Sequence, residues 1–304
     1  LRLIVHFSKS SYILPHYRQF YSFTMMENQN NQTLKNALSG DINAFQSLFA
    51  GFQNQLKSYL YRLLASRNDA EDLTHDTFIK AFEKLSTFKG EASLKTWIFQ
   101  IATNLSYNYL QKQKRWTPDV SEQAKKLVLQ NPALRNEIIK VHETSTDAKY
   151  DMKEHIDTCF TCISKNLPIE NQIALMLKDI YDFSVTEICM ILEKTEGIVK
   201  YLLQDGRKTM TEIFDNRCAL VNKNGVCHQC SELNGWFNAK ENQQQALMKL
   251  DLVKGSKKYN RDELYQIRTT LVKAIDPLRS KGADLQEILL KCNSMAMGEV
   301  PFTN

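Results

Sequence analysis

Hydrophobic residues recur every three or four positions along most of this chain, which is the spacing of one face of an α-helix. The clearest stripe runs through residues 94–115, at Leu94, Trp97, Ile98, Ile101, Ala102, Leu105 and Tyr109. Weaker or shorter stripes lie within 33–66, 69–85, 167–213, 241–253, 261–275 and 284–296. With 10 Gly and 6 Pro in 304 residues and few Val/Thr runs, the pattern predicts an all-α protein.

Breaks between the stripes predict two small helical domains joined by a linker, followed by a helical C-terminal appendix. The predicted linker contains Pro118 and Pro132 and shows only weak periodicity, so we expect some helix there, with a structured subdomain as the alternative. The predicted segments are an arm at 1–32, a helical bundle at 33–116, the linker at 117–150, a second domain at 151–215, a Cys-rich loop at 216–240 and the appendix at 241–304.

The second domain contains a predicted helix-turn-helix. Leu167-Pro168 begins a helix that ends near Tyr181. Ser184, followed by Glu187 three residues later, forms a capping-box pattern for a helix over 185–192. A tight turn then leads to Thr195, which is expected to cap a third helix reaching about residue 213. Alone, this pattern is moderate support for DNA binding, because short helical hairpins are common.

Two neighbouring helices of the first domain differ sharply in charge. Residues 69–85 carry five acids against two Lys, whereas residues 94–115 contain no Asp or Glu, four Lys/Arg and four aromatic residues. The non-stripe face of the second helix comprises Thr96, Gln100, Thr103, Tyr107, Gln111 and Lys114. A solvated helix ordinarily mixes Glu with Lys, so this polar, aromatic, acid-free face points to a polyanionic partner.

Both domains resemble a known family. DAEDLTHDTFIKAFEKLSTFKGEASLKTWIFQIATNLSYNYLQKQKR resembles region 2 of bacterial sigma factors of the extracytoplasmic-function (ECF) type, and LPIENQIALMLKDIYDFSVTEICMILEKTEGIVKYLL resembles their region 4. The two matches follow the family's order and span roughly residues 35–215. The resemblance implies a transcription initiation factor that binds core RNA polymerase, directs it to specific promoters and promotes DNA melting.

The resemblance also implies roles for particular residues in region 2. The acidic helix would dock on the polymerase through Asp69, Asp72, His75 and Asp76, with His75 standing where the family usually has Gln. The loop at 88–93 is where the family captures a flipped-out base. Aromatic faces and uncharged donors hold unstacked bases while Lys and Arg follow phosphates. Candidate minus-ten contacts are Lys89, Ser93, Lys95, Gln100, Asn104, Tyr107, Lys112, Lys114 and Arg115.

In region 4 the third helix would enter the major groove of the minus-thirty-five element. Candidate contacts are Thr195, Glu196, Lys200, Gln204, Arg207 and Lys208. The family often continues with Ser-Arg and a dense run of Arg, whereas this chain has Tyr201, Leu202, Asp205 and Gly206. This departure weakens the expected grip on phosphate.

Other functions were weighed against this one. The main alternative is a helix-turn-helix transcriptional regulator that acts independently of polymerase. Taken singly, an acidic helix is usually a solvated face, and the bases at Lys112 to Arg115 could simply complement a helix dipole. No Gly-rich phosphate loop, nucleophile elbow or pair of catalytic carboxylates stands out in the sequence, so we do not expect an enzyme.

Composition sets the expected location and partners. The formal charge of +5 permits a polyanionic partner, and no apolar run approaches the length of a membrane span, so we expect a cytoplasmic protein without membrane insertion. The first 24 residues are basic and acid-free, and we expect translation to start at Met25 or Met26. Expected partners are core RNA polymerase and promoter DNA, with an anti-sigma factor as a further candidate. For the appendix we expect a regulatory role.

Two C-x-x-C pairs flank the helix-turn-helix. No cofactor is required by the expected function, but Cys159, Cys162, Cys227 and Cys230 are candidate ligands of a structural zinc ion. Cys218, His155 and His228 are reserve ligands, whereas Cys189 lies on an apolar stripe and is expected in the core. A thiol-based redox switch and plain reduced cysteines remain as alternatives.

Overall fold

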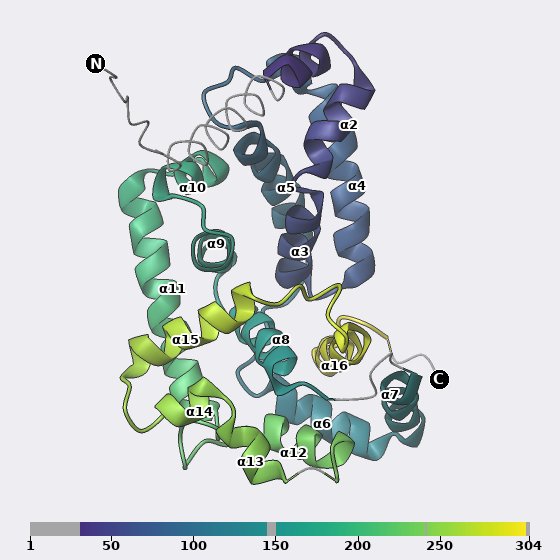
Figure 1. The fold of residues 1–304 in the computed structure, drawn as a ribbon, viewed down its shortest axis with the longest axis vertical. Coiled ribbons are helices and arrows are strands. Elements are labelled where there is room, and N and C mark those ends of the chain that lie inside the picture. Colours follow the sequence, from purple (N-terminus) through teal and green to yellow (C-terminus); the bar gives the residue numbers. More distant parts are fainter. Residues whose placement is uncertain (1–30, 145–149, 241, 302–304) are drawn as a thin grey trace, which may run out of the picture.

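The computed structural model describes residues 31–144, 150–240 and 242–301, and the regular elements in these ranges are helices (Figure 1). A helix over 31–38 opens the described chain. It is followed by α2 (Ile42–Ala50), α3 (Gln53–Leu64), α4 (Arg67–Glu83), η1 (Leu85–Thr87), α5 (Leu94–Leu110), α6 (Val120–Gln130), α7 (Pro132–Thr144), α8 (Met152–Ser164), α9 (Ile169–Leu175), η2 (Met176–Ile180), α10 (Val185–Leu192), α11 (Glu196–Arg217), α12 (Gln229–Phe237), α13 (Gln243–Met248), α14 (Asp251–Gly255), α15 (Arg261–Lys273) and α16 (Ala283–Ala296). The prediction of an all-α fold is confirmed, and most of the predicted N-terminal arm lies outside the described residues.

Helices α2 to α5 form a bundle, which we call the bundle unit (33–116). Helix α3 packs against both α4 and α5. Aromatic side chains fill the space between α2 and α4: the ring of Phe78 lies 5.2 Å from those of Phe45 and Phe49. Helix α4 begins at a capped N-terminus, where the Ser66 hydroxyl accepts a hydrogen bond from the backbone N–H of Asp69 at 3.3 Å.

Helices α8 to α11 form the helix-turn-helix unit (151–215). The predicted capping box is present, because Ser184 and Glu187 exchange side-chain and backbone hydrogen bonds at the start of α10. Glu193 takes a left-handed conformation (φ 54°) and makes the turn into α11. Gly206 allows α11 to approach α9 closely, because a Cβ at this position would lie 3.0 Å from the side chain of Leu175.

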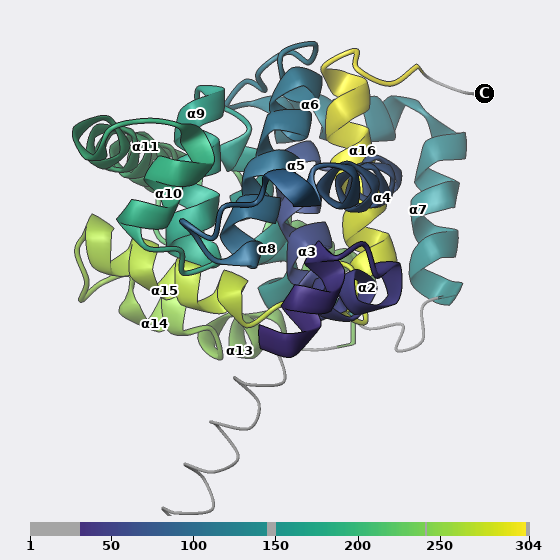
Figure 2. The ribbon, with the colours of Figure 1, turned by 90° about the horizontal axis from the view of Figure 1, so that it is seen from above.

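The two units share one continuous apolar core rather than standing apart. Helix α5 packs against α10, and the two views place these helices side by side (Figure 2). The ring of Phe99 lies 4.8 Å from that of Phe183, and Tyr59 meets Tyr181 edge-on at 5.6 Å. The bundle unit and the helix-turn-helix unit are therefore in direct contact in this structure.

The segment predicted as a linker folds into α6 and α7, which pack against α16 (Figure 1). Ala124, Ile138 and Leu289 belong to a second apolar core built by these three helices with parts of α8, α12, α14 and α15. The predicted Cys-rich loop contains helix α12, and the predicted helix over 241–253 is divided into α13 and α14. The C-terminal segment thus packs along both the predicted linker and α8 instead of hanging from one end.

One buried cation joins these parts. Arg62 on α3 is 2% exposed and forms an ion pair with Asp157 on α8, with the Nε of Arg62 donating to Oδ1 at 2.9 Å. Its remaining donors reach Ser58 Oγ, Tyr181 Oη and the carbonyl oxygens of Val272 and Ile275, at 2.6–3.1 Å. The guanidinium therefore links α3, α8, the end of η2 and the end of α15.

We expect Asp157→Asn to lower the free energy of unfolding by about 3–5 kcal/mol, because it leaves the Arg62 charge buried without its counter-charge. Urea unfolding of the full chain measures the loss. The matched control is Asp251→Asn, which removes a carboxylate from an exposed pair with Lys254 and should leave the midpoint unchanged. Equal effects of the two substitutions would contradict the central role of the buried pair.

Candidate nucleic-acid interface

A groove of about 390 Å³ lies where the predicted base-capturing loop meets the start of α5. Its aromatic side is formed by Phe88 and Trp97, whose rings are 5.4 Å apart. Gly90 has a φ of +74°, a left-handed conformation that turns the loop back towards α5 and that glycine adopts without strain. Ser93 then caps α5 by accepting the backbone N–H of Thr96 at 3.0 Å. The groove thus combines the aromatic surface on which an unpaired base can stack with the hydroxyl groups of Thr87 and Thr96 and the cationic side chain of Lys89.

In this structure the helix-turn-helix unit covers one side of the groove. Met190 and Glu193 of this unit line it. The Thr96 hydroxyl donates to Glu187 Oε1 at 3.0 Å, and Gln100 Nε2 donates to Glu193 Oε1 at 2.8 Å. Glu193 therefore lines the groove beside Glu91 of the loop, and Glu187 binds the Thr96 hydroxyl next to it.

The predicted minus-ten residues divide into three groups. Lys89, Asn104, Lys112 and Lys114 are exposed, and Tyr107 is half-buried. Ser93, Lys95 and Gln100 take part in the closed arrangement: Ser93 caps α5 and bonds the hydroxyl of Thr96, Gln100 bonds Glu193, and the Lys95 ammonium lies 4.7 Å from the ring centroid of Phe183.

Arg115 forms the third group on its own. It is half-buried, and its Nη2 donates to Gln172 on α9 and to the Ser164 carbonyl oxygen. Burial lowers the pKa of Arg115 to about 10, and Glu299 opposes that shift. Arg115 thus points into the protein here, whereas Lys112 and Lys114 point to solvent.

The acidic helix α4 presents the predicted polymerase-facing side chains on one face. Asp72, His75 and Asp76 are exposed at i, i+3 and i+4. Asp69 is half-buried. Burial raises the pKa of Tyr109 on α5, and the hydrogen bond and negative charge of Asp69 raise it further. Ile79, 42% exposed, lies on the same face as Asp76 and was missed. The sequence could have identified Ile79 from its position three residues after Asp76, which places it on the same helix face. An exposed apolar residue beside carboxylates suits a protein interface.

Helix α11 exposes the predicted reading face at four-residue intervals, at Glu196, Lys200, Gln204 and Lys208. Thr195 is exposed at its N-terminus, and its side chain makes no capping hydrogen bond. Glu196 and Lys200 form an exposed ion pair at 2.6 Å. Tyr201, 64% exposed, adds an aromatic side chain that sequence reasoning treated only as a gap in a basic run.

Arg207 has a different environment from the rest of this helix. Its Nε donates to Asp179 Oδ2 at 2.9 Å and its Nη2 to Asp179 Oδ1, while the Tyr265 hydroxyl also donates to Asp179. These hydrogen bonds tie α11 to η2 and α15. Arg207 is accordingly engaged within the protein and is less free for DNA than Lys200 or Lys208.

The cysteines of the two C-x-x-C pairs lie near one another. Cys159, Cys162, Cys227 and Cys230, together with Cys218, line one small cavity. Within the described ranges, however, no three or more His, Cys, Asp or Glu side chains are placed so that they could hold a metal ion as they stand. Nor does any described helix have the length and apolarity needed to cross a bilayer.

Comparison with known proteins gives consistent matches. The family model for sigma-70 region 2 matches residues 48–116. The ECF RNA polymerase sigma-E factor of Haemophilus influenzae is 28% identical over 178 residues, covering 58% of this chain and 90% of that protein. The ECF RNA polymerase sigma factor SigW of Bacillus subtilis is 28% identical over 185 residues, covering 61% of this chain and 96% of that protein.

Among solved structures, the sigma factor RpoE in complex with the anti-sigma factor NepR from Bartonella quintana is 19% identical, with a TM-score of 0.39, covering 56% of this chain and 96% of that one. Residues 48–116 thus match sigma-70 region 2, and the chain is similar to ECF sigma factors along most of their length, in agreement with the resemblance. More than a third of the chain lies outside the two aligned lengths.

We expect Glu193→Asn to tighten binding of a single-stranded minus-ten oligonucleotide to the free protein about fivefold. Asn tolerates the left-handed conformation but is too short to keep the hydrogen bond to Gln100. Losing that bond lowers the free energy that favours the closed arrangement by about 1 kcal/mol, which raises the population of the open arrangement about fivefold. Fluorescence anisotropy measures the affinity. The control Glu196→Gln removes the same charge from the same unit away from the groove and should change little. Equal tightening by both variants would indicate a general charge effect instead of closure.

Proposed function

We propose that this protein binds core RNA polymerase and directs it to specific promoters, promoting DNA melting at the minus-ten element. The observation that carries the proposal is the pairing of two opposite surfaces on adjacent helices. Helix α4 exposes Asp72, Asp76 and Ile79, a surface for a protein partner, while α5 exposes an acid-free face beside the groove of Phe88 and Trp97. A protein that only bound duplex DNA would need neither the acidic surface nor the aromatic groove.

The helix-turn-helix unit supplies the second DNA contact. The exposed face of α11 suits the major groove of a minus-thirty-five element, with Lys200 and Lys208 for phosphates and Gln204 for a base edge. The unit also covers the groove of Phe88 and Trp97 through Met190 and Glu193, while Glu187 binds Thr96 beside it. Carboxylates at that position repel phosphate, so promoter binding requires the two units to separate at this contact.

Chemistry and location follow from this role. RNA synthesis would be catalysed by the polymerase, and the protein would act in the cytoplasm, where core enzyme and promoters meet. An anti-sigma factor is a further proposed partner. By binding the closed arrangement more tightly than the open one, such a partner would hold the groove covered.

Run-off transcription tests the proposal. Core polymerase is mixed with the full chain and a set of genomic promoter fragments, with core alone and chain alone as controls. Discrete transcripts that need both components support the function. Duplex binding by the chain alone, with no transcript and no association with core, would favour the polymerase-independent regulator.

We expect the double substitution Asp72→Lys/Asp76→Lys to weaken binding to core polymerase about tenfold or more, since attraction becomes repulsion at the docking face. Both side chains are exposed, so helicity and melting should remain unchanged. Surface plasmon resonance with immobilised core measures the affinity. The control Asp251→Lys/Asp262→Lys makes the same charge change on the C-terminal segment and should bind normally. If the two double variants bind core equally well, the docking surface lies elsewhere.

We expect Lys112→Gln/Lys114→Gln to reduce the slope of log affinity against log salt for promoter DNA by about 1.4–1.8, because two phosphate contacts and their released counterions are lost. Arg115 is left intact because it is held inside the protein. Holoenzyme binding is titrated at several salt concentrations. Lys125→Gln/Lys126→Gln, which removes two exposed charges from α6, is the control. An unchanged slope in the Lys112/Lys114 variant would remove these residues from the DNA path.

A further inference from the structure

Five cysteines from distant parts of the chain converge between α8 and the segment that joins α11 to α12. Helix α8 carries Cys159 and Cys162, Cys218 follows the end of α11, Cys227 lies in the connecting segment and Cys230 lies in the first turn of α12. All five are free cysteines in this structure. The cavity that they line has a volume of about 40 Å³, enough for a single ion or water molecule. Its lining contains His155 and no carboxylate.

Four of the five thiols influence one another electrostatically. Burial raises the pKa of the Cys159 thiol well above its usual range, and the charges of Cys227, Cys230 and Cys218 raise it further. Burial likewise raises the pKa of Cys230, with additional effects from Cys218 and then Cys227. Burial raises the pKa of Cys227 too, and Glu122 and then Cys218 add to that shift. Each member of this quartet (Cys159, Cys218, Cys227 and Cys230) therefore lies within electrostatic reach of the other three.

The backbone holds two members of the quartet in register. Cys218 and Cys227 form an isolated parallel bridge, in which Cys227 N donates to Arg217 O at 2.8 Å and Ala219 N to Cys227 O at 3.1 Å. Gly225 makes this possible: a Cβ at that position would lie 2.7 Å from backbone atoms of Cys218 and Ala219. A segment built this tightly around two cysteines has a defined geometry, unlike a free loop.

Cys162 occupies a different place. It lies beside Cys159 and Cys227, and its sulfur accepts a hydrogen bond from Asn293 Nδ2 at 3.5 Å. Burial and then Cys227 raise the pKa of its thiol to about 12, while Arg217 and Lys165 oppose the shift. Cys162 thus has a partner of its own outside the quartet.

We propose that the quartet binds one zinc ion as a closed structural site that fastens α8 to the start of α12. Four thiols and one Zn²⁺ would give a tetrathiolate centre of net charge −2, with four protons released to solvent. Soft thiolate ligands favour zinc over Mg²⁺ or Ca²⁺. Arg217 lines the same cavity and Arg268 lies within electrostatic reach of Cys230, so both would offset part of that charge. In the described residues the thiols are not placed to hold an ion as they stand, so binding would require their side chains to turn towards the cavity that they line.

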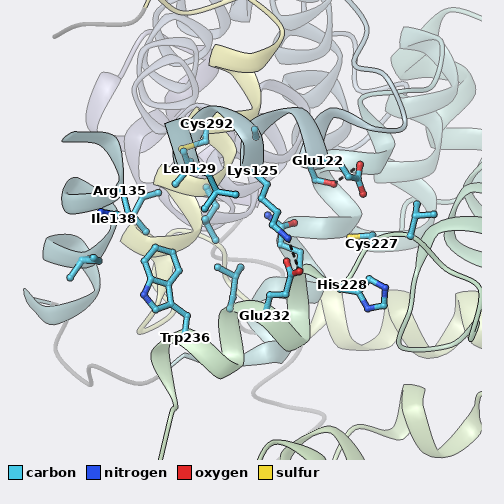
Figure 3. Close-up of a pocket in the computed structure, with 18 of the residues that line it drawn as sticks. Glu122, Lys125, Leu129, Arg135, Ile138, Cys227, His228, Glu232, Trp236 and Cys292 are labelled. Carbon is cyan, nitrogen blue, oxygen red and sulfur yellow. Dashed lines mark hydrogen bonds and ion pairs between the residues drawn. The ribbon is translucent and has the colours of Figure 1, made fainter. Parts of the chain in front are cut away.

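An open route leads to the site. Cys227 also lines a larger cavity of about 560 Å³ between α6, α7, α12 and α16 (Figure 3). Cys227 and His228 lie at one end of that cavity, and the Lys125–Glu232 ion pair lies between them and Trp236. An ion or a chelator can therefore approach Cys227 from solvent through this cavity.

The decisive measurement is the metal content of the full chain purified without chelator, by inductively coupled plasma mass spectrometry. We expect one zinc per chain, lost on Cys→Ser substitution at each quartet position and retained in Cys162→Ser, Cys189→Ser and Cys292→Ser. Because quartet variants could fail to fold, cobalt is titrated into the reduced, zinc-stripped wild-type chain as a second readout. Visible d–d bands of tetrahedral cobalt with thiolate-to-metal charge transfer support the site.

Three outcomes would overturn the proposal. The first is a wild-type chain that holds no zinc and shows no cobalt bands under reductant. The second is zinc that survives Cys218→Ser but is lost in Cys162→Ser, which would assign the ligands to the two C-x-x-C pairs. The third is the detection by mass spectrometry of disulfide bonds among the quartet in the metal-free protein, which would assign these cysteines to a thiol-based redox switch.

Discussion

The buried guanidinium of Arg62 is the constraint on which the rest of the structure depends. Removing a cation from water costs several kcal/mol unless a counter-charge and hydrogen bonds replace the lost hydration. Burial disfavours the charge, yet the carboxylate of Asp157 and the hydroxyl of Tyr181 keep the pKa of Arg62 above its ordinary value. Its partners belong to α3, α8, the end of η2 and the end of α15. The bundle unit, the helix-turn-helix unit and the C-terminal segment must therefore assemble together for this charge to be tolerated.

The contact that covers the minus-ten groove is of a different kind. Besides the packing of Phe99 on Phe183, it includes the partly buried hydrogen bond Thr96–Glu187 and the exposed one Gln100–Glu193, each worth about 1 kcal/mol net. Breaking the Arg62 centre would cost several times as much. A binding partner can therefore uncover the groove at its rim more cheaply than it can dismantle the junction below. The energy for any larger separation of the units has to come from their contacts with polymerase and promoter.

What the sequence could predict depended on how local the determining interactions are. The capping box of Ser184 and Glu187 involves residues three apart, so α10 was predicted to the residue. The difference in charge between α4 and α5 can likewise be seen directly in the sequence. By contrast, α6 and α7 bury their weak apolar faces against α16, more than 130 residues away, so they were predicted as a linker. The hydrogen bonds of Arg115 with Gln172 and of Arg207 with Asp179 join residues 57 and 28 positions apart, so the sequence did not reveal them.

The central claim is that the minus-ten groove is closed by α10 in the free protein and open in the transcribing complex. A photo-reactive amino acid in place of Met190, which lines the groove, tests it directly. The claim predicts that illumination of the free protein cross-links position 190 to the segment 87–100, and that this product disappears in the open promoter complex. An equal yield of the same intramolecular cross-link in a complex that is synthesising RNA, or no such cross-link in the free protein, would contradict the claim.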